Sequence, residues 1–547
     1  MRVLRARTVC VTLLVAAGLV LGLRGQTPES RLFFSSVGLP GIDTGAIADQ
    51  RQTPTSRDAA RRAEFDRSLE RDLAAAAPSP LSPRVIVKFR DEAAIERRRD
   101  AVQAASNGSE ILTRQSYADF DIVRISADAD PEAVARALSQ RPEVEYAQAA
   151  HRFHATFVPN DPLYSTMQWN LPMLNLERAW DIQPQAGSSI TVAVLDTGMA
   201  FRDLTISANL PAFRDEFGTR YPALGPVTIP YSAAPQLVGA SGAGRVVAPY
   251  DVLSGGINPP LDFDGHGTHV SGTIGQLTND SIGTAGVAFN VKLMPVKVLA
   301  SEWDVLFRGA SSIGGSDDDI ARGVRYAADN GAKIINMSLG GSGPPDCATN
   351  STKNGCAPVI EAAMRYAVSK GSFIVVAGGN EFEDNVPPFG VNPTSVLAEI
   401  ASRIPGVVSV AAVDRAKNHA YYSSSGPYIE IAAPGGSERG FVGGTGFVRQ
   451  QTFDFNFTDT FLLPPSAFRA PRFDLFGYIG YIGTSMAAPH VAGVAAMMMQ
   501  QGITDPAAIE DALEKFAVDL GTPGRDDMFG FGLVDARASL RGLGIAK

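Results

Sequence analysis

Apolar runs with the character of strands alternate with helix-like segments between residues 191 and 413. The strand-like runs lie near 191–196, 291–299, 333–338, 373–377 and 407–413, and the helix-like segments lie near 270–276, 319–330 and 358–370. Strands that are joined through helices run parallel, and the helices then cover both faces of the sheet. The pattern therefore predicts a three-layer αβα architecture with a mainly parallel central sheet. The whole chain, at 547 residues, is too long for one ordinary domain.

A short motif, Gly483-Thr484-Ser485, stands directly before an apolar, Ala-rich stretch that begins at Met486. The glycine permits a sharp turn and the alanines favour a helix. Ser485 is therefore expected at a helix start, where backbone N–H groups lack partners and the helix dipole is positive. Such a place suits a nucleophile beside an oxyanion site, but it also suits an ordinary N-cap serine.

A serine nucleophile needs a base and a carboxylate to activate it. The chain has only 6 His, and His266 lies between two glycines in Asp264-Gly265-His266-Gly267. Asp196 ends an apolar strand-like run, which is where α/β folds place chemistry. The order Asp196, His266, Ser485 is one of the three known chain orders for a catalytic triad.

Five blocks of sequence resemble those of one protein family, the subtilases. The signature blocks are LDTG at 195–198, DGHGTHVSG at 264–272 and GTSMAAPHVAG at 483–493; VVAGGN at 375–380 resembles the oxyanion-hole segment, and INMSLGG at 335–341 the substrate-binding strand. The blocks occur in the family's order, and the resemblance covers roughly residues 158–547. It implies a subtilisin-like fold and a serine endopeptidase that hydrolyses peptide bonds through an acyl-enzyme.

The resemblance also implies a role for each matching residue. Ser485 would be the nucleophile, His266 the base and Asp196 the residue that orients the base. Asn380 would complete the oxyanion hole, and Ser338, Leu339 and Gly340 would pair with extended substrate backbone. The family places the base at the first histidine of its motif, so we expect the neighbouring histidines, His269 and His490, to be structural.

The N-terminus predicts export. Residues 1–25 contain three arginines, a short apolar run and small residues, as in a signal peptide; the rival, an uncleaved membrane anchor, is disfavoured because the run is short. We therefore expect a secreted or periplasmic protein without a membrane segment after cleavage. Residues 26–80 are interpreted as a linker or weakly ordered segment. The net charge of −9 disfavours nucleic acid as a partner.

Residues 81–150 show a β-α-β-β-α-β pattern, which predicts a small ferredoxin-like α+β domain. The pattern resembles the inhibitory propeptide of secreted subtilases; an unrelated small domain is the alternative. Its place directly before the protease blocks favours a self-processed zymogen whose own propeptide is an intramolecular inhibitor. We expect the cut within residues 149–157 and a monomeric mature enzyme.

Segments rich in Gly, Pro, Ser and aromatic residues interrupt the domain at 158–547. They lie near 206–262, 303–316, 342–357 and 436–478, and they are interpreted as surface insertions that shape the cleft or merely decorate it.

Two cysteines remain in an exported chain, because Cys10 would leave with the signal peptide. Cys347 and Cys356 bracket a short polar loop, so they predict one disulfide, with two free thiols as the alternative. The pairing would add about 2–3 kcal/mol in the chain-entropy model.

A structural calcium ion is implied by a further resemblance, between residues 277–288 and the family's calcium-binding loop. The expected ligands are backbone carbonyls and carboxylates, the hard oxygen donors that calcium prefers. The full set is Asp161, Asp203, Thr278, Asp280, Ile282 and Thr284.

Three other functions remain open at this stage. A processing protease would cut few sites because its insertions restrict the cleft. A non-catalytic binding protein on the same scaffold is disfavoured by the intact motifs, and a lipase by the absence of a G-x-S-x-G elbow around Ser485. The natural substrate and the residue preferred before the cut stay undetermined: Glu381, Glu383 and Asp384 either favour a basic side chain there or are solvated loop acids.

Overall fold

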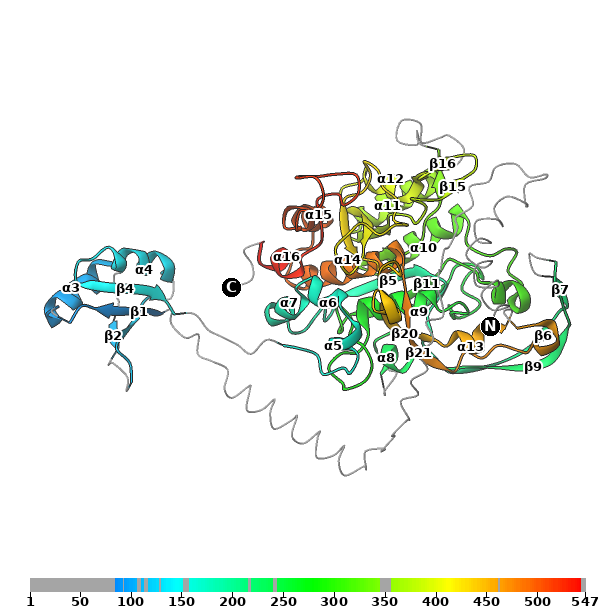
Figure 1. Ribbon diagram of the computed structural model, residues 1–547, viewed down its shortest axis with the longest axis horizontal. Coiled ribbons are helices and arrows are strands. Elements are labelled where there is room, and N and C mark those ends of the chain that lie inside the picture. Colours follow the sequence, from blue (N-terminus) through cyan, green and yellow to red (C-terminus); the bar gives the residue numbers. More distant parts are fainter. Residues whose placement is uncertain are drawn as a thin grey trace, which may run out of the picture. The chain divides into compact units, whose positions relative to one another are not determined.

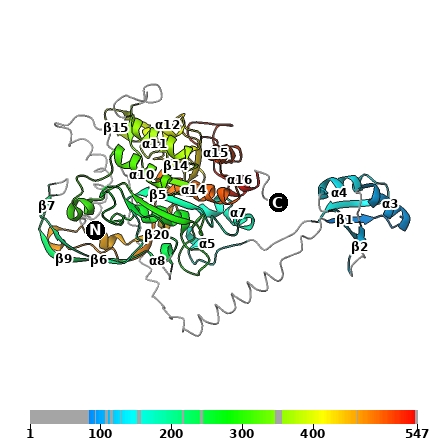
Figure 2. The same ribbon diagram turned by 180° about the vertical axis from the view of Figure 1, so that it is seen from behind.

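The computed structural model describes residues 84–542, apart from 92, 106–109, 113–116, 127–128, 151–156, 215–217, 240–243, 345–355 and 461–462. The chain divides into two compact units, one within residues 44–155 and one that contains residues 156–547. Both units are drawn from opposite sides in Figure 1 and Figure 2. The segments expected as a signal peptide and a linker, 1–25 and 26–80, lie outside the described residues.

The smaller unit is a four-stranded antiparallel sheet with two helices. Its elements are β1 (Arg84–Phe89), α3 (Ile95–Ala105), β2 (Glu110–Leu112), β3 (Asp121–Arg124), α4 (Pro131–Ser139) and β4 (Val144–Ala149). The strand order is β2-β3-β1-β4. Alternate residues of β1, namely Val85, Val87 and Phe89, are buried with Val102 of α3 and Leu138 of α4. The predicted ferredoxin-like α+β domain is confirmed.

The larger unit is built on a seven-stranded sheet in which every neighbouring pair is parallel. In spatial order its strands are β10 (Tyr250–Asp251), β11 (Lys292–Lys297), β5 (Thr191–Asp196), β12 (Ile334–Met337), β14 (Phe373–Ala377), β18 (Val407–Val413) and β19 (Ile431–Pro434). These runs are rich in Val, Ile and Ala and almost wholly buried, as expected for strands covered on both faces.

Helices cover both faces of this sheet (Figure 1). Val192 and Val194 of β5 pack in one core, with α7 (Leu176–Ile182), α9 (His266–Gly275) and α14 (Thr484–Gln500). Ala193 and Leu195 pack in a second core, with α10 (Asp317–Asp329), α11 (Pro358–Ser369) and most of α12 (Val396–Ala401). The predicted three-layer αβα architecture is confirmed, because successive residues of one strand enter different layers.

Shorter elements connect and cap these layers. They are α5 (Tyr164–Met167), α6 (Asn170–Met173), β6 (Leu204–Leu210), β7 (Phe213–Arg214), β8 (Arg220–Tyr221), β9 (Leu224–Tyr231), α8 (Pro235–Val238), η1 (Asp304–Arg308), β13 (Ser342–Gly343), β15 (Asn385–Val386), β16 (Gly390–Val391), β17 (Thr394–Ser395), η2 (Val442–Gly444), β20 (Val448–Phe453), α13 (Phe455–Thr458), η4 (Pro465–Ala467), β21 (Phe476–Tyr481), α15 (Pro506–Lys515) and α16 (Ala536–Gly542). None of the helices in the described part of the chain is both long and apolar enough to cross a membrane.

Parts of the expected surface insertions are buried. The segment near 206–262 supplies β10, an edge strand of the central sheet, and the segment near 436–478 supplies β20, whose Val448, Gln450 and Thr452 are fully buried. In the segment near 303–316, Asp304 is buried against Lys297. The expectation of surface insertions differs from the structure at these positions, because Gly, Pro and aromatic content marks irregular backbone and not exposure.

Candidate active site

Three neighbouring strands end at the same edge of the sheet. After β5, the chain forms β10 and β11 on one side and then returns to form β12 on the other, so the strand order reverses at β5. Crevices for ligands form at the carboxyl ends of strands at such a reversal. Asp196 is the last residue of β5, Ser338 follows β12, and Asn380 follows β14. The helices α9 and α14 begin with the residues His266 and Thr484.

Asp196 and His266 form a buried pair. Asp196 Oδ1 lies 2.8 Å from His266 Nδ1, and both side chains are at most 1% exposed. Asp196 Oδ1 also accepts from the backbone N–H of Thr197 at 2.7 Å. A carboxylate held in this way fixes the imidazole with its proton on Nδ1, so that Nε2 is the atom that can take a proton.

The charges around His266 tune its basicity. Burial lowers the pKa of His266, but the negative charge and the hydrogen bond of Asp196, with the charges of Asp264 and Asp262, raise it more, and the net pKa lies above the ordinary histidine value. Burial, followed by the charge of Asp262, raises the pKa of Asp264 to about 7. The imidazolium that forms during proton transfer is therefore stabilised by nearby carboxylates.

Asp262 organises the loop before His266, and the sequence analysis missed it. It is fully buried, and its Oδ1 accepts from Thr197 Oγ1 at 2.9 Å and from the N–H of Gly265 at 2.8 Å. Its Oδ2 accepts from Thr268 Oγ1 at 2.6 Å. One carboxylate thus joins the strand that carries Asp196 to the helix that carries His266. The only signal in the sequence was its position four residues before His266.

Ser485 lies in the first turn of α14, as the sequence predicted. The helix is capped by Gly483, whose φ of 149° favours glycine. The Ser485 hydroxyl donates to the carbonyl of Ser338 at 3.3 Å, and the Ser338 hydroxyl donates to the carbonyl of Ser485 at 2.8 Å. The end of β12 and the start of α14 are therefore in direct contact at the serine.

Asn380 meets the same helix start. Its Oδ1 accepts from the backbone N–H of Thr484 at 2.8 Å and from Thr484 Oγ1 at 2.9 Å. Because the oxygen of the amide is held by Thr484, the NH2 group is the part that can donate beside Ser485. The structure thus brings Asn380 to the start of the helix that carries Ser485.

The residues expected to bind substrate backbone continue directly from β12. Ser338 is fully buried, Leu339 is almost so, and Gly340 is more exposed. A side chain added at Gly340 would meet only the Ser395 hydroxyl, 4.0 Å away, so the backbone there borders open space. An extended peptide could approach this edge and pair with it.

His269 and His490 occupy structural positions. His269 Nε2 lies 3.1 Å from the carbonyl oxygen of Val448, and burial lowers its pKa to about 3. His490 lies between Asn170 and the carbonyl of Met486, and burial lowers its pKa to about 4. Both rings are fully buried and neutral near pH 7, which agrees with the structural roles expected for them.

Two of the three acidic residues after Asn380 have hydrogen-bond partners within the protein. Glu381 accepts from the backbone N–H of Asn380 at 2.8 Å, and burial raises its pKa. Glu383 forms two hydrogen bonds of 2.8 Å with Arg439. Neither contact suggests a pocket that is poised for a basic substrate side chain.

The expected calcium ligands are brought together in part. Asp161 accepts from the N–H of Asn279 at 2.7 Å, its Oδ1 is buried without a hydrogen-bond partner, and its pKa is raised by burial and by the charge of Asp280. Asp203 is exposed and accepts from the N–H of Ala233; it does not form a cluster of three carboxylates with the other two.

Gln236, which the sequence analysis missed, stands beside Asp280. Its Nε2 donates to Asp280 Oδ2 at 3.0 Å, while its buried Oε1 has no hydrogen-bond partner. The two orphaned oxygens, one from Asp161 and one from Gln236, fit a hard cation such as calcium. Of the carbonyls expected as ligands, that of Thr284 accepts from Gln276 Nε2 at 2.7 Å.

Comparisons with known proteins identify the family of the chain. A family model described as the subtilase family matches residues 187–532, and one described as the fervidolysin N-terminal prodomain matches residues 78–149. The chain is 28% identical over 436 residues to the thermophilic serine proteinase of Bacillus sp. (strain AK1), which covers 79% of this chain and 82% of that protein.

Two further relatives are similar over most of the chain. An extracellular protease of Xanthomonas campestris pv. campestris is 31% identical over 429 residues, covering 75% of this chain and 62% of that protein. A solved structure of a protease from Pseudoalteromonas arctica is 29% identical, covering 71% of this chain and 99% of that one, with a TM-score of 0.49. Since the subtilase model matches more than half of its residues, this chain belongs to the subtilase family and is a subtilisin-like serine endopeptidase with an N-terminal propeptide domain.

Proposed function

We propose that the chain hydrolyses protein substrates through a catalytic triad of Asp196, His266 and Ser485. The observation that carries this is the buried contact of 2.8 Å between Asp196 and His266, at the edge of the sheet where Ser485 lies in the first turn of α14. His266 takes the proton of the Ser485 hydroxyl as that oxygen attacks the scissile carbonyl. His266 then gives the proton to the leaving amine, and water hydrolyses the acyl-enzyme by the same steps.

The negative charge on the carbonyl oxygen is stabilised by the Asn380 NH2 group and the backbone N–H of Ser485. The anchoring of the Asn380 oxygen by Thr484 supports this role, since it orients the amide before substrate binds. The backbone of Ser338, Leu339 and Gly340 pairs with the substrate as an added strand. Pairing through backbone accepts many sequences, which fits a general endopeptidase.

We further propose that the enzyme is exported and made as a self-processed zymogen. The basis is the N-terminal pattern of residues 1–25 and a propeptide domain at 81–150, cut within 149–157. The similar protein of Xanthomonas campestris is named an extracellular protease, which supports a secreted or periplasmic location. The mature enzyme is expected to act as a monomer, without nucleic acid or membrane partners.

Two stabilising features complete the proposal. Calcium would be held by Asp161, Asp280, Gln236 and backbone carbonyls near Thr278 and Ile282. Its positive charge would link the loop after α9 to the segment of Asp161, near the expected N-terminus of the mature chain. Cys347 would pair with Cys356. Cys356 is fully buried just before α11, whereas Cys347 lies outside the described residues.

Mass spectrometry and casein cleavage by the wild type and Ser485→Ala test the proposal. The wild type should lose residues up to about 149–157 and cleave casein. The variant should keep the propeptide domain and lose about 10⁴-fold or more in kcat. Equal processing and equal activity of the two proteins would refute the nucleophile role. A folded wild type that binds casein without cutting it would favour the non-catalytic alternative.

A further inference from the structure

The helix that carries His266 is held from two sides. On the side of β5, Thr197 Oγ1 accepts from the N–H of Gly267 at 2.9 Å, and Asp262 holds Thr268. These bonds fix His266 against Asp196, and they involve no part of the chain near Ser485. The opposite side of the helix faces the hairpin formed by β20 and β21, where we find a separate set of contacts.

The first of these contacts reaches the residue directly before His266. Thr452 of β20 is fully buried, and its Oγ1 donates to the carbonyl of Gly265 at 2.6 Å. Gly265 caps α9 with a φ of 104°, and a side chain added there would stand 2.9 Å from Thr452 Oγ1. The hairpin therefore packs directly on the backbone turn that sets the position of His266.

The second contact lies one turn later on α9. His269 Nε2 lies 3.1 Å from the carbonyl oxygen of Val448 and 3.2 Å from that of Ile479, and its ring stacks on that of Tyr481 at 4.3 Å. Because His269 is neutral, its one ring proton sits on Nε2 and is shared by the two carbonyls. The first turn of α9 is thus bonded to both strands of the hairpin.

The same hairpin leads into the nucleophile. β21 ends at Tyr481, four residues before Ser485, and Gly483 between them is fixed by its N–H, which donates to Gly435 at 3.0 Å. We propose that the β20–β21 hairpin sets the distance between base and nucleophile, and that Thr452 is a positioning residue that acts through Gly265. The inference rests on the base and nucleophile roles proposed above.

The physical reason is that His266 must meet two partners at once. Asp262 and Thr197 fix it to the carboxylate. Its helix packs on α14, and the hairpin adds hydrogen bonds between the first turn of that helix and the strand that leads to Ser485. Without the Thr452 hydroxyl, the carbonyl of Gly265 would keep only the N–H of His269 as a partner, and the turn would lose its bond to the hairpin. A shift that leaves the substrate-binding residues unchanged should lower kcat and spare KM.

Thr452→Val, which removes the hydroxyl at nearly constant volume, is the decisive variant. We expect kcat to fall about 10-fold while KM stays within about twofold, and we expect the NMR resonance of the His266 Nδ1 proton to broaden. Thr452→Ser should restore both. Thr458→Val is the matched control: its buried hydroxyl lies in the same segment and has no hydrogen-bond partner, so kcat should not change.

The possible outcomes are distinguishable. A folded Thr452→Val with wild-type kcat overturns the proposal, as does a loss that Thr452→Ser fails to restore. If Thr452→Val does not fold, His269→Phe keeps the stacking on Tyr481 but removes the shared proton, and a wild-type kcat in that variant overturns the proposal. His266→Ala, measured in parallel, tests the base role itself, because its retained activity would refute that role whatever Thr452 does.

Discussion

Asn380 is anchored by its oxygen, and this determines how its loss should be tested. Asn380→Ala and the isosteric Asn380→Asp both remove the NH2 donor, so both should lower kcat by about 10²–10³-fold with little change in KM. Thr484→Val removes only one of the bonds to the Asn380 oxygen and should cost much less. Steady-state kinetics on a chromogenic peptide measure all three. An Asn380→Asp enzyme with normal kcat would exclude the NH2 group from the oxyanion hole.

Asp264 is a second residue whose effect can be measured, through the pH profile. The base works in its neutral form, so kcat/KM should rise with pH through the raised pKa of His266. Asp264→Asn keeps an acceptor for the N–H of His266 but removes a carboxylate that is partly ionised near pH 7, and this lowers the pKa of the imidazole. The rise of kcat/KM on the acid side of the pH profile should therefore move to lower pH by about half a unit. Asp511→Asn, which removes an exposed carboxylate on α15, is the control and should leave the pH profile unchanged.

At the scale of single residues, the sequence predicted those with a motif and missed those that support them. Asp196, His266 and Ser485 were found because glycines and apolar runs surround them. Asp262 acts through a hydrogen bond to the side chain of Thr197, 65 positions earlier, and Thr452 acts through one to the backbone of Gly265, 187 positions earlier. No sequence pattern indicates that a threonine in a strand makes such a hydrogen bond, so only the folded structure shows it.

At the scale of elements, the loop after α9 allows a test between two sets of calcium ligands, one expected from the sequence and one suggested by the structure. Calcium should raise the midpoint of thermal unfolding, and a concentration of 100 times its Kd corresponds to about 2.7 kcal/mol. Asp280→Asn and Gln236→Ala should remove most of this gain, because both residues border the orphaned oxygens. Asp203→Asn, expected from sequence but standing apart in the structure, should keep it. The Ser485→Ala background prevents autolysis during calorimetry.

A loss of the calcium effect in Asp203→Asn and its retention in Gln236→Ala would reverse this assignment. The sequence resemblance supplied the loop itself, but it could not supply Gln236. That residue comes from α8, inside a segment interpreted as an insertion, and reaches Asp280 only through the packing of α8 on α9.

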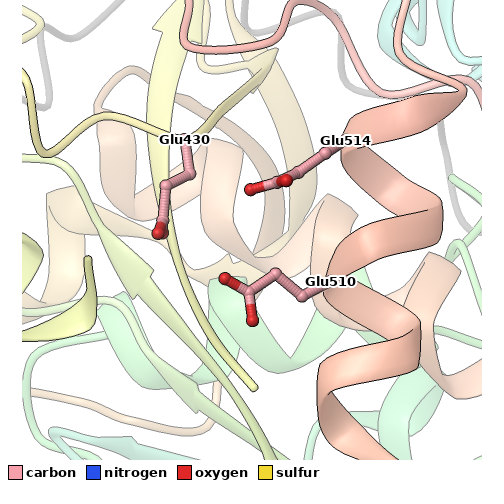
Figure 3. Close-up of side chains that lie close together, drawn as sticks. All are labelled: Glu430, Glu510 and Glu514. Atoms are coloured by element: carbon pink, nitrogen blue, oxygen red, sulfur yellow. The ribbon is translucent and has the colours of Figure 1, made fainter. Parts of the chain in front are cut away.

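The helix α15 brings three carboxylates together outside the candidate active site (Figure 3). Glu510 and Glu514 project from α15 toward Glu430, which precedes β19. Burial first, and the neighbouring negative charges next, raise the pKa of Glu430 to about 8 and those of Glu510 and Glu514 to about 7. The protons are shared by the group, so these pKa values belong to the cluster.

This cluster should make the protein less stable as pH rises. The pKa of a glutamate is near 4.5 in the unfolded chain, so between about pH 4.5 and 8 the folded state binds more protons and the free energy of unfolding falls. Glu510→Gln keeps an acceptor for the N–H of Gly406 and should gain about 1–2 kcal/mol at pH 8 but little at pH 4.5. Denaturant unfolding of the Ser485→Ala background at both pH values measures this. A gain for Glu510→Gln that is equal at pH 4.5 and pH 8 would contradict this prediction.

At the scale of the whole molecule, the fold was predictable because its signals are long and repeated. The alternation of buried strands and amphipathic helices fixes the parallel sheet and its layers, and β1 to β4 follow the alternation read from residues 84–149. The burial of β20 was not predictable, because Val-Arg-Gln-Gln-Thr-Phe contains polar residues whose buried hydrogen bonds go to other segments.

The division into two units leads to the last prediction, because the smaller unit has a hydrophobic core of its own. The proposed zymogen predicts that residues 81–157, added as a separate polypeptide, inhibit the mature enzyme, since the residues before the cut are a product of its own reaction and should compete with substrate. Residues 81–149, which lack the tail after β4, should inhibit at least about 10-fold less tightly, a difference of 1.4 kcal/mol.

Titration of peptide hydrolysis with each segment gives the two inhibition constants. Val87→Asp places a charge in the core of the small unit and should abolish inhibition by either segment, which shows that a folded domain is required. If the two segments inhibit equally, the tail does not occupy the cleft, and the small unit must act through its folded surface alone.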